Sequence, residues 1–332
     1  MNPLDFIYLM ISVFIFPGLI FMLCLALFTQ YLVRKMSAKI QRRMGPTYVG
    51  PYGILQPFYD LLKLLRSKEI VATRHSMVKL AESSLLIGIA SAITSIILFP
   101  ISLFNLSSPL DYLVFFYLAS VIPVSMLIIA SLSMPNPFTV IGVSRLLSMV
   151  TLSEPTFFAS LFIPLFLASR GDERLFLSIS AYSTIPSLWC DLFTALVLIL
   201  SLISAVVSVQ AKIMYPPFNI PEAEQEIVAG FETEFSGPLL SLAILLHDID
   251  LSISALAIVY LLLAGPWPFS HLDPLGIVVL VAKYLAVVFV IVLMKNVFGR
   301  YRIEQALYQL FKYGVVPALL SAILATLYIY IG

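Results

Sequence analysis

The sequence predicts an all-α, polytopic membrane protein of about eight transmembrane helices. Of its 332 residues, 61% are hydrophobic and only 11% are charged, and the mean hydropathy is +1.03. A soluble domain carries about 25% charged residues, so lipid must cover most of this surface. Apolar runs near the ~20 residues that cross a bilayer recur along the chain. Helices are the open-chain structure that satisfies every backbone group in lipid.

The apolar runs place the spans near residues 6–33, 80–103, 111–132, 143–168, 189–213, 238–264, 275–298 and 313–331. Pro123 and Pro164 lie inside two of these runs, where a kink or local break is expected. No repeat or long linker divides the sequence. Residues 1–332 are therefore treated as a single transmembrane domain.

The distribution of Lys and Arg predicts the orientation. One side holds sixteen: Arg34, Lys35, Lys39, Arg42, Arg43, Lys63, Arg66, Lys68, Arg74, Lys79, Arg145, Lys212, Lys295, Arg300, Arg302 and Lys312. The other side holds Arg170 and Arg174, and Lys283 falls within a span, which accounts for all nineteen. Because cytoplasmic loops carry the excess of positive charge, we expect a multi-pass protein of the cell membrane with both termini outside.

The first cytoplasmic segment, 34–79, is too polar to span the membrane. Its apolar residues repeat at helical spacing: Ile54, Leu55, Phe58, Leu61, Leu62 and Leu65. Asp60, Lys63 and Ser67 fall on the opposite face, after a Gly- and Pro-rich turn at 45–53. This pattern predicts an amphipathic helix lying at the membrane interface.

The second cytoplasmic segment, 214–237, concentrates acidic residues. It holds five of the eighteen acids in the chain: Glu222, Glu224, Glu226, Glu232 and Glu234. One interpretation is a solvated loop. However, apolar residues alternate with the acids, and a loop folded against the membrane would crowd its carboxylates together. Crowded, partly desolvated carboxylates exchange protons near neutral pH, which suits ion coupling.

Several ionisable residues fall inside predicted spans. Glu154 lies in the fourth span and Lys283 in the seventh, so each is expected to face the bundle interior or a water-filled cavity. A structural ion pair between them is the alternative. His247, Asp248 and Asp250 make the sixth span polar at mid-depth, either as a proton relay or because that helix is broken or shifted.

Other classes of function lack support in the sequence. The net charge of +1 gives no basis for nucleic-acid binding. Cys24 and Cys190 show no CxxC spacing, so neither an iron–sulfur cluster nor a zinc site is predicted, and we expect no metal in this chain. Phosphate-binding and nucleophile motifs are also missing from the sequence. We therefore predict no catalytic residue.

Three stretches have distinctive motifs: 41–57 (QRRMGPTYVGPYGILQP), 217–226 (PFNIPEAEQE, continuing to Gly230 and 234–237), and 300–305 (RYRIEQ). Together they resemble the H subunit of complex I and its relatives in membrane-bound hydrogenases. With eight spans, the resemblance covers nearly the whole chain. It implies a membrane anchor for a hydrophilic redox arm, which couples electron transfer to proton or sodium translocation.

The resemblance also implies roles for particular residues. Arg42, Arg43 and Gln56 would lie at the redox-arm interface, and Glu222, Glu224, Glu226 and Glu234 would form an acidic funnel. Glu154, Lys283, Lys295, Arg300 and Arg302 would continue or frame the charged path, the last three beside the redox-arm interface. Iron–sulfur clusters, and a nickel–iron centre in the hydrogenase branch, would lie in hydrophilic partner subunits. Other partners would be membrane subunits, including antiporter-like ones, and lipid.

Departures from that family's pattern favour one branch. Thr47 stands where Asn is usual, Glu232 adds an acid, and His247-Asp248 replaces a Glu-Tyr pair. These differences favour a ferredoxin-dependent hydrogenase or sulfur reductase over a quinone-reducing complex. A stand-alone transporter that uses Glu154 and His247 for proton coupling is a further alternative, and an anchor with no ion path is another.

Overall fold

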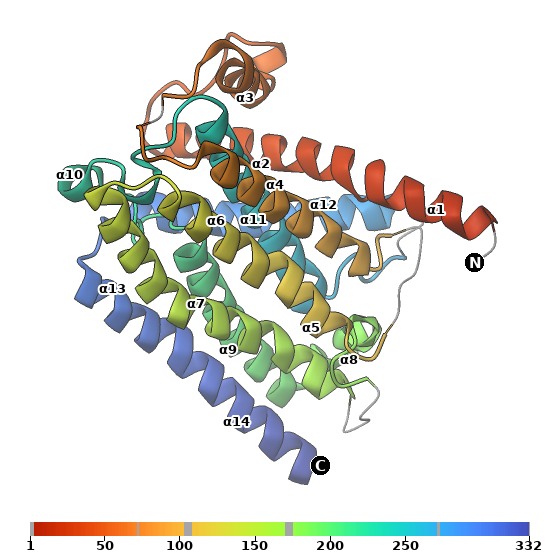
Figure 1. Cartoon of the computed structure of the whole chain (residues 1–332). Coiled ribbons are helices and arrows are strands. Elements are labelled where there is room, and N and C mark those ends of the chain that lie inside the picture. The colour runs from red at the N-terminus through yellow and green to blue at the C-terminus, as the bar shows by residue number, and fades with distance from the viewer. Residues whose placement is uncertain (1–2, 72, 103–107, 170–174, 271–272, 332) are drawn as a thin grey trace.

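A computed structural model describes residues 3–71, 73–102, 108–169, 175–270 and 273–331, and every regular element in those ranges is helical (Figure 1). Within them, eight helices are long and apolar enough to cross a membrane, which confirms the predicted fold class. Arg170, Arg174 and His271 lie outside the described residues.

Eight spans follow the chain order, several built from two elements. They are α1 (Pro3–Phe14) with α2 (Leu19–Ile40), α4 (Val78–Ser95), α5 (Asp111–Phe116) with α6 (Ile122–Leu132), α7 (Pro137–Ser169), α9 (Leu192–Lys212), α11 (Pro238–Leu261), α12 (Pro274–Val297), and α13 (Ile303–Leu310) with α14 (Val316–Ile331). The last span begins well before residue 313, because α13 continues into α14 through a π-helical turn.

Helix α11 is the centre of the bundle. It packs against α2, α4, α7, α9 and α12, and 89% of its most apolar stretch is buried inside the protein. Small residues on neighbouring helices permit close approach, as is usual between helices in lipid. On α9, for example, Ser201, Ser204, Ala205 and Ser208 are all fully buried.

The prolines within spans have two different outcomes. A π-helical turn, Tyr117–Val121, precedes Pro123, so a local distortion occurs there as expected. Helix α7 instead runs unbroken through Pro155 and Pro164, so the expected break at Pro164 does not occur. Pro164 has no N–H to donate to the Ser160 carbonyl, and the Ser201 hydroxyl of α9 donates to that carbonyl instead.

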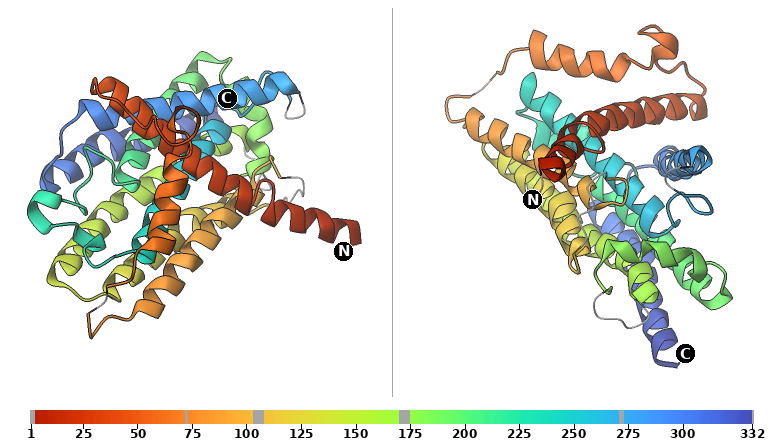
Figure 2. Two further views of the ribbon diagram at one scale, coloured as in Figure 1. Left: turned by 90° about the horizontal axis from the view of Figure 1, so that it is seen from above. Right: turned by 90° about the vertical axis from the view of Figure 1, so that its right-hand side faces the viewer.

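The two ends of the bundle differ in structure. Both termini lie at one end, whereas α10 (Glu224–Ile227) and the start of α13 lie at the other (Figure 1). Helix α3 (Gln56–Ser67) lies beyond the ends of α2 and α4, set apart from the bundle, and contacts α2 and α11 (Figure 2). The short helix α8 (Ile185–Leu188) precedes α9.

Candidate functional site

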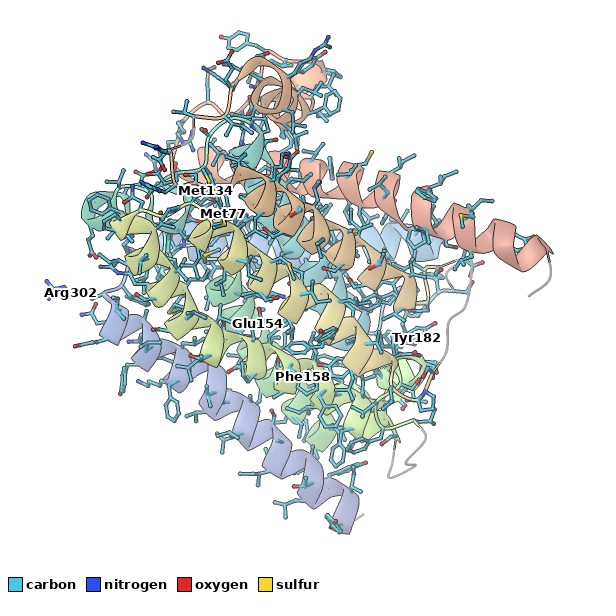
Figure 3. The ribbon with its side chains drawn as sticks, viewed as in Figure 1. Met77, Met134, Glu154, Phe158, Tyr182 and Arg302 are labelled. Atoms are coloured by element: carbon cyan, nitrogen blue, oxygen red, sulfur yellow. The ribbon has the colours of Figure 1, made fainter. Side chains whose placement is uncertain are left out.

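A buried charge cluster lies inside the bundle where four segments meet. The Lys212 ammonium, in the last turn of α9, is 2.9 Å from Asp250 Oδ1 of α11 and 3.8 Å from Glu154 Oε1 of α7. It also donates to Ser120 Oγ, at 2.5 Å, in the π-helical turn before α6. Figure 3 places Glu154 midway along the bundle. All three charged residues are at most 8% exposed.

The position of Lys212 corrects one expectation. On the sequence alone it is assigned to a cytoplasmic flank, because it ends an apolar run. In the structure its side chain is only 1% exposed and turns back into the bundle. Asp250 attracts it, since an unpaired buried carboxylate costs several kcal/mol. The lysine at a span end and the acid at mid-span give no sequence signal that they meet.

Lys283 lies apart from Glu154. Its ammonium donates to the carbonyls of Leu263, Gly265 and Trp267, at 2.7, 2.9 and 3.0 Å, just after α11 ends. It therefore satisfies backbone acceptors in the turn that follows α11. Lys212, rather than Lys283, is the cation that the structure brings to Glu154.

The polar residues of α11 lie within an unbroken helix, so the span is not broken at this cluster. His247 hydrogen-bonds through Nε2 to the Ile213 carbonyl, and its Nδ1 is 3.9 Å from Asp248 Oδ1. Because residues three apart share a helix face, His247 and Asp250 line one cavity of about 30 Å³ together with Lys212. Asp248 points elsewhere, toward α2 and α3.

The acidic segment folds back onto the bundle. It contains α10 and a 3₁₀ turn, Gly230–Glu232, which packs closely on α7 at Gly142. A Cβ at Gly142 would overlap the backbone of Gly230 and Phe231, so only glycine permits this contact. The solvated-loop interpretation is therefore wrong for this 3₁₀ turn.

The five glutamates of this segment occupy three environments. Glu224 and Glu226 are exposed, and Glu226 pairs with Arg145 at 2.5 Å. Glu234 accepts a hydrogen bond from Asn136, also 2.5 Å long. Glu222 and Glu232 are half-buried and lie near each other and near His247.

Burial changes the proton affinity of the inner two glutamates. It raises the pKa of Glu232 to about 8, and the neighbouring Glu222 charge adds to this rise while His247 opposes it. Burial also raises the pKa of Glu222, against the lowering effect of His247, Lys295 and Arg300. A carboxyl with a pKa near neutrality gains and loses its proton under physiological conditions.

Lys295 lies beside this inner group. Its ammonium is 3.7 Å from the centre of the Tyr215 ring, a cation–π contact, and that ring lies 5.2 Å from the His247 ring. Burial raises the pKa of the Tyr215 hydroxyl. The Lys295 side chain is half-buried, and it lies next to the acidic segment.

A larger cavity, of about 320 Å³, lies beneath α3, between α2 and α11. Its polar lining residues are Gln30, Arg34, Asp60, Lys63, Lys68, Ser241 and Asp248. Arg34 and Asp60 form an ion pair of 2.6 Å that ties α3 to α2, and Gln56 donates to the other Asp60 oxygen. Asp248 Oδ1 is buried and accepts no hydrogen bond. Gln56 is thus held within α3.

The remaining residues expected at the redox-arm interface are exposed at the same end of the bundle. Arg42 and Arg43 follow α2, and Arg300 and Arg302 precede α13. Figure 3 shows Arg302 at the edge of the molecule. A second surface cavity, of about 350 Å³, is lined by Arg145, Glu226, Arg300 and Arg302. In the described parts of the chain, no three His, Cys, Asp or Glu side chains gather as a metal site would require.

Fold and site together define a polytopic helical membrane protein with a buried charge cluster and an acidic segment folded onto it. The family model for NADH dehydrogenase matches residues 12–326, and the chain belongs to that family. A solved structure of the membrane-bound sulfane sulfur reductase, an archaeal respiratory membrane complex, contains a chain with the same fold. The TM-score is 0.75 at 24% identity, over 97% of this chain and 99% of that one.

Proposed function

We propose that this chain is the membrane subunit of an ion-translocating respiratory oxidoreductase complex. It anchors the hydrophilic redox arm and passes charge changes in that arm to a path for protons or sodium ions across the cell membrane. It has no catalytic role of its own. Membership of the NADH dehydrogenase family favours this function over a stand-alone transporter.

The observation that carries the proposal is a connected series of ionisable side chains. Glu222 and Glu232 interact electrostatically with His247. His247 shares a cavity with Lys212 and Asp250, and Lys212 reaches Glu154. Ionisable residues within a membrane are costly, and they mark ion pathways more often than structural sites. An anchor with no ion path would gain nothing from this series.

The surface around Arg42 and Arg43 supports attachment of a hydrophilic arm. Three large side chains beside them are strongly exposed: Met44 (86%), Tyr48 (94%) and Tyr52 (81%). Tyrosine, methionine and arginine are enriched at protein interfaces. Partners of this kind would be iron–sulfur and hydrogenase-like subunits, with antiporter-like membrane subunits alongside the bundle. This end would face the cytoplasm, with both termini outside.

The terminal electron acceptor of the complex depends on which branch of the family this chain belongs to. The likeness in fold to the sulfane sulfur reductase chain supports a ferredoxin-dependent hydrogenase or sulfur-reducing complex. The 320 Å³ cavity beneath α3, with its buried Asp248, supports quinone binding as a second candidate. Mild purification of the native assembly, followed by mass spectrometry and assays with reduced ferredoxin and with quinone, separates the two. Hydrogen or sulfide production supports the first, and quinone reduction the second.

Coupling is tested in the purified complex reconstituted into vesicles. Glu222→Gln removes one of the two inner, half-buried charges of the acidic segment, and we expect redox turnover to continue while ion uptake falls at least about tenfold. Glu224→Gln changes an exposed carboxylate in the same segment and serves as the matched control. Full ion uptake by Glu222→Gln would contradict the coupling role of this segment.

A further inference from the structure

A basic cavity and an apolar groove meet on the flank of the bundle that α13 and α14 form (Figure 1). The basic cavity is the surface cavity of about 350 Å³ that Arg145, Arg300 and Arg302 line. The apolar groove, of about 370 Å³, lies where α9, the end of α12 and the start of the last span come together. Tyr301 lines both, so the two are continuous. Its amide donates to the Pro217 carbonyl at 3.0 Å, which fixes this shared residue in place.

The basic cavity has a surplus of positive charge. Arg145 is balanced by Glu226, with which it forms an ion pair of 2.5 Å. Arg300 and Arg302 are exposed, and so is Glu304 beside them. Among the described residues of the lining, three arginines therefore face two glutamates, which leaves a charge of +1. Guanidinium groups bind phosphate through paired hydrogen bonds, so one phosphodiester anion would neutralise this cavity.

Aromatic and basic side chains indicate that the cavity lies at the level of the lipid headgroups. Tyr308 and Tyr313, in the first turns of the last span, are both exposed. Lys312 is exposed between them along the chain, and its ammonium is 5.0 Å from the centre of the Tyr313 ring. Tyrosine and lysine collect where a membrane meets water. Because Tyr313 also lines the apolar groove, the groove begins where the headgroups end.

Exposed apolar side chains continue the groove along α9 toward the middle of the membrane. Val207 and Ile203 line the groove itself. Ile199 and Leu196 follow at helical spacing on the same face, and they are 48% and 50% exposed. From Val207 to Leu196 the helix rises by about 16 Å. The hydrocarbon of one leaflet is about 15 Å thick, so this face has the length of one lipid chain.

We propose that the basic cavity and the apolar groove form one binding site for an anionic phospholipid. Its phosphate lies between Arg300 and Arg302, and one hydrocarbon chain passes Tyr301 and follows α9. Basic pockets between transmembrane helices bind anionic headgroups in this way. The bound lipid holds α9, α13 and the acidic segment together from outside the bundle. The site requires only that the chain crosses a membrane, so it is independent of ion coupling.

The test uses the detergent-purified complex and a phosphatidylglycerol that carries a photoactivatable diazirine in one acyl chain. Irradiation attaches that chain to the side chains it touches, and mass spectrometry of the peptides locates the label. We expect label on α9 at Ile203 and Val207 and on α12 at Met294, all of which line the groove. Unlabelled phosphatidylglycerol should compete about fivefold better than phosphatidylcholine, because the choline cation removes one net negative charge.

Charge variants of the cavity should act in opposite directions. Arg300→Gln and Arg302→Gln are each expected to lower labelling about fivefold at probe concentrations below saturation, the effect of one positive charge at a membrane surface. Glu304→Gln removes an acid from the same cavity and should raise labelling by a similar factor, which a misfolded variant would not do. Arg300→Lys keeps the charge and should keep most of the label. Arg74→Gln, an exposed arginine before α4 and outside the cavity, is the matched control.

A variant of the groove tests the hydrocarbon part separately. Ile203→Trp fills the groove and leaves the arginines unchanged, so label at Val207 should fall. Unchanged labelling in this variant or in Arg300→Gln combined with Arg302→Gln would overturn the proposal. So would label of equal strength on the exposed Leu319 and Ile323 of α14, since this would show that lipid has no preferred place.

Two other occupants have distinct outcomes. If glycerol 3-phosphate displaces the probe as well as phosphatidylglycerol does, the cavity binds a free anion and the lipid assignment is wrong. A groove that takes no label in the intact complex is covered by another subunit, which also overturns the proposal.

Discussion

Replacing Glu232 with Gln tests whether the acidic segment holds a carboxyl group whose pKa is raised by folding. The pKa of Glu232 is about 8 in the folded protein, against 4.5 for a free glutamate. Between these values the folded chain binds one proton more than the unfolded chain, so the free energy of unfolding falls as pH rises. The loss is on the order of 1 kcal/mol per pH unit while Glu232 titrates. Below pH 4.5 the contribution of this group is fully present.

Thermal unfolding of the detergent-purified chain between pH 5 and 9 measures this difference. The melting temperature of the wild type should fall more steeply with pH than that of Glu232→Gln, which has no proton to lose. The two proteins should therefore diverge mainly between pH 5 and 8. Glu224→Gln is the control, because that side chain is exposed and should melt as the wild type does. Parallel curves for wild type and Glu232→Gln would refute the reasoning.

Three further predictions concern other contacts. Lys212→Met should lower the free energy of unfolding by about 3–5 kcal/mol, because two carboxylates lose their buried partner; a calorimetric loss below 1 kcal/mol would contradict this. Gly142→Ala should cost about 1–3 kcal/mol by displacing the acidic segment, whereas Gly299→Ala, with no atom within 4 Å of the added methyl, should be neutral. Arg34→Gln should change stability by less than about 1 kcal/mol but speed proteolysis at α3; unchanged cleavage would show that this ion pair does not hold α3.

The eight spans were predictable because apolar runs of bilayer length have few alternatives. The residues at which the spans begin and end were less predictable. The start of the last span was missed because Glu304 in α13 and Lys312 in the following π-helical turn lower the local hydropathy, although the helix continues through them. The continuity of α7 at Pro164 also depends on Ser201, a residue on another helix, because its hydroxyl donates the hydrogen bond that the proline cannot. Such cross-helix compensation leaves no local signal.

The candidate site was predictable in its parts but not in its pairings. Glu154 and His247 stand out in any hydropathy profile. Lys212 does not, because a lysine at the end of an apolar run usually snorkels toward water. The five glutamates look alike in sequence, and only the fold of the segment partly buries Glu222 and Glu232 while leaving Glu224 and Glu226 exposed. The close contact that decides this, at Gly142, lies far away in the chain.

The central position of α11 has a consequence for biosynthesis. A helix that carries Asp248 and Asp250 at mid-depth enters lipid at a cost of about 2.5–3.5 kcal/mol per charge on translocon scales. The ribosome makes α9, which carries Lys212, before α11. The positive charge that pairs with Asp250 is therefore already in the membrane when α11 leaves the translocon. The order of helices along the chain thus lets the span that carries Asp250 be inserted after the helix that carries its partner Lys212.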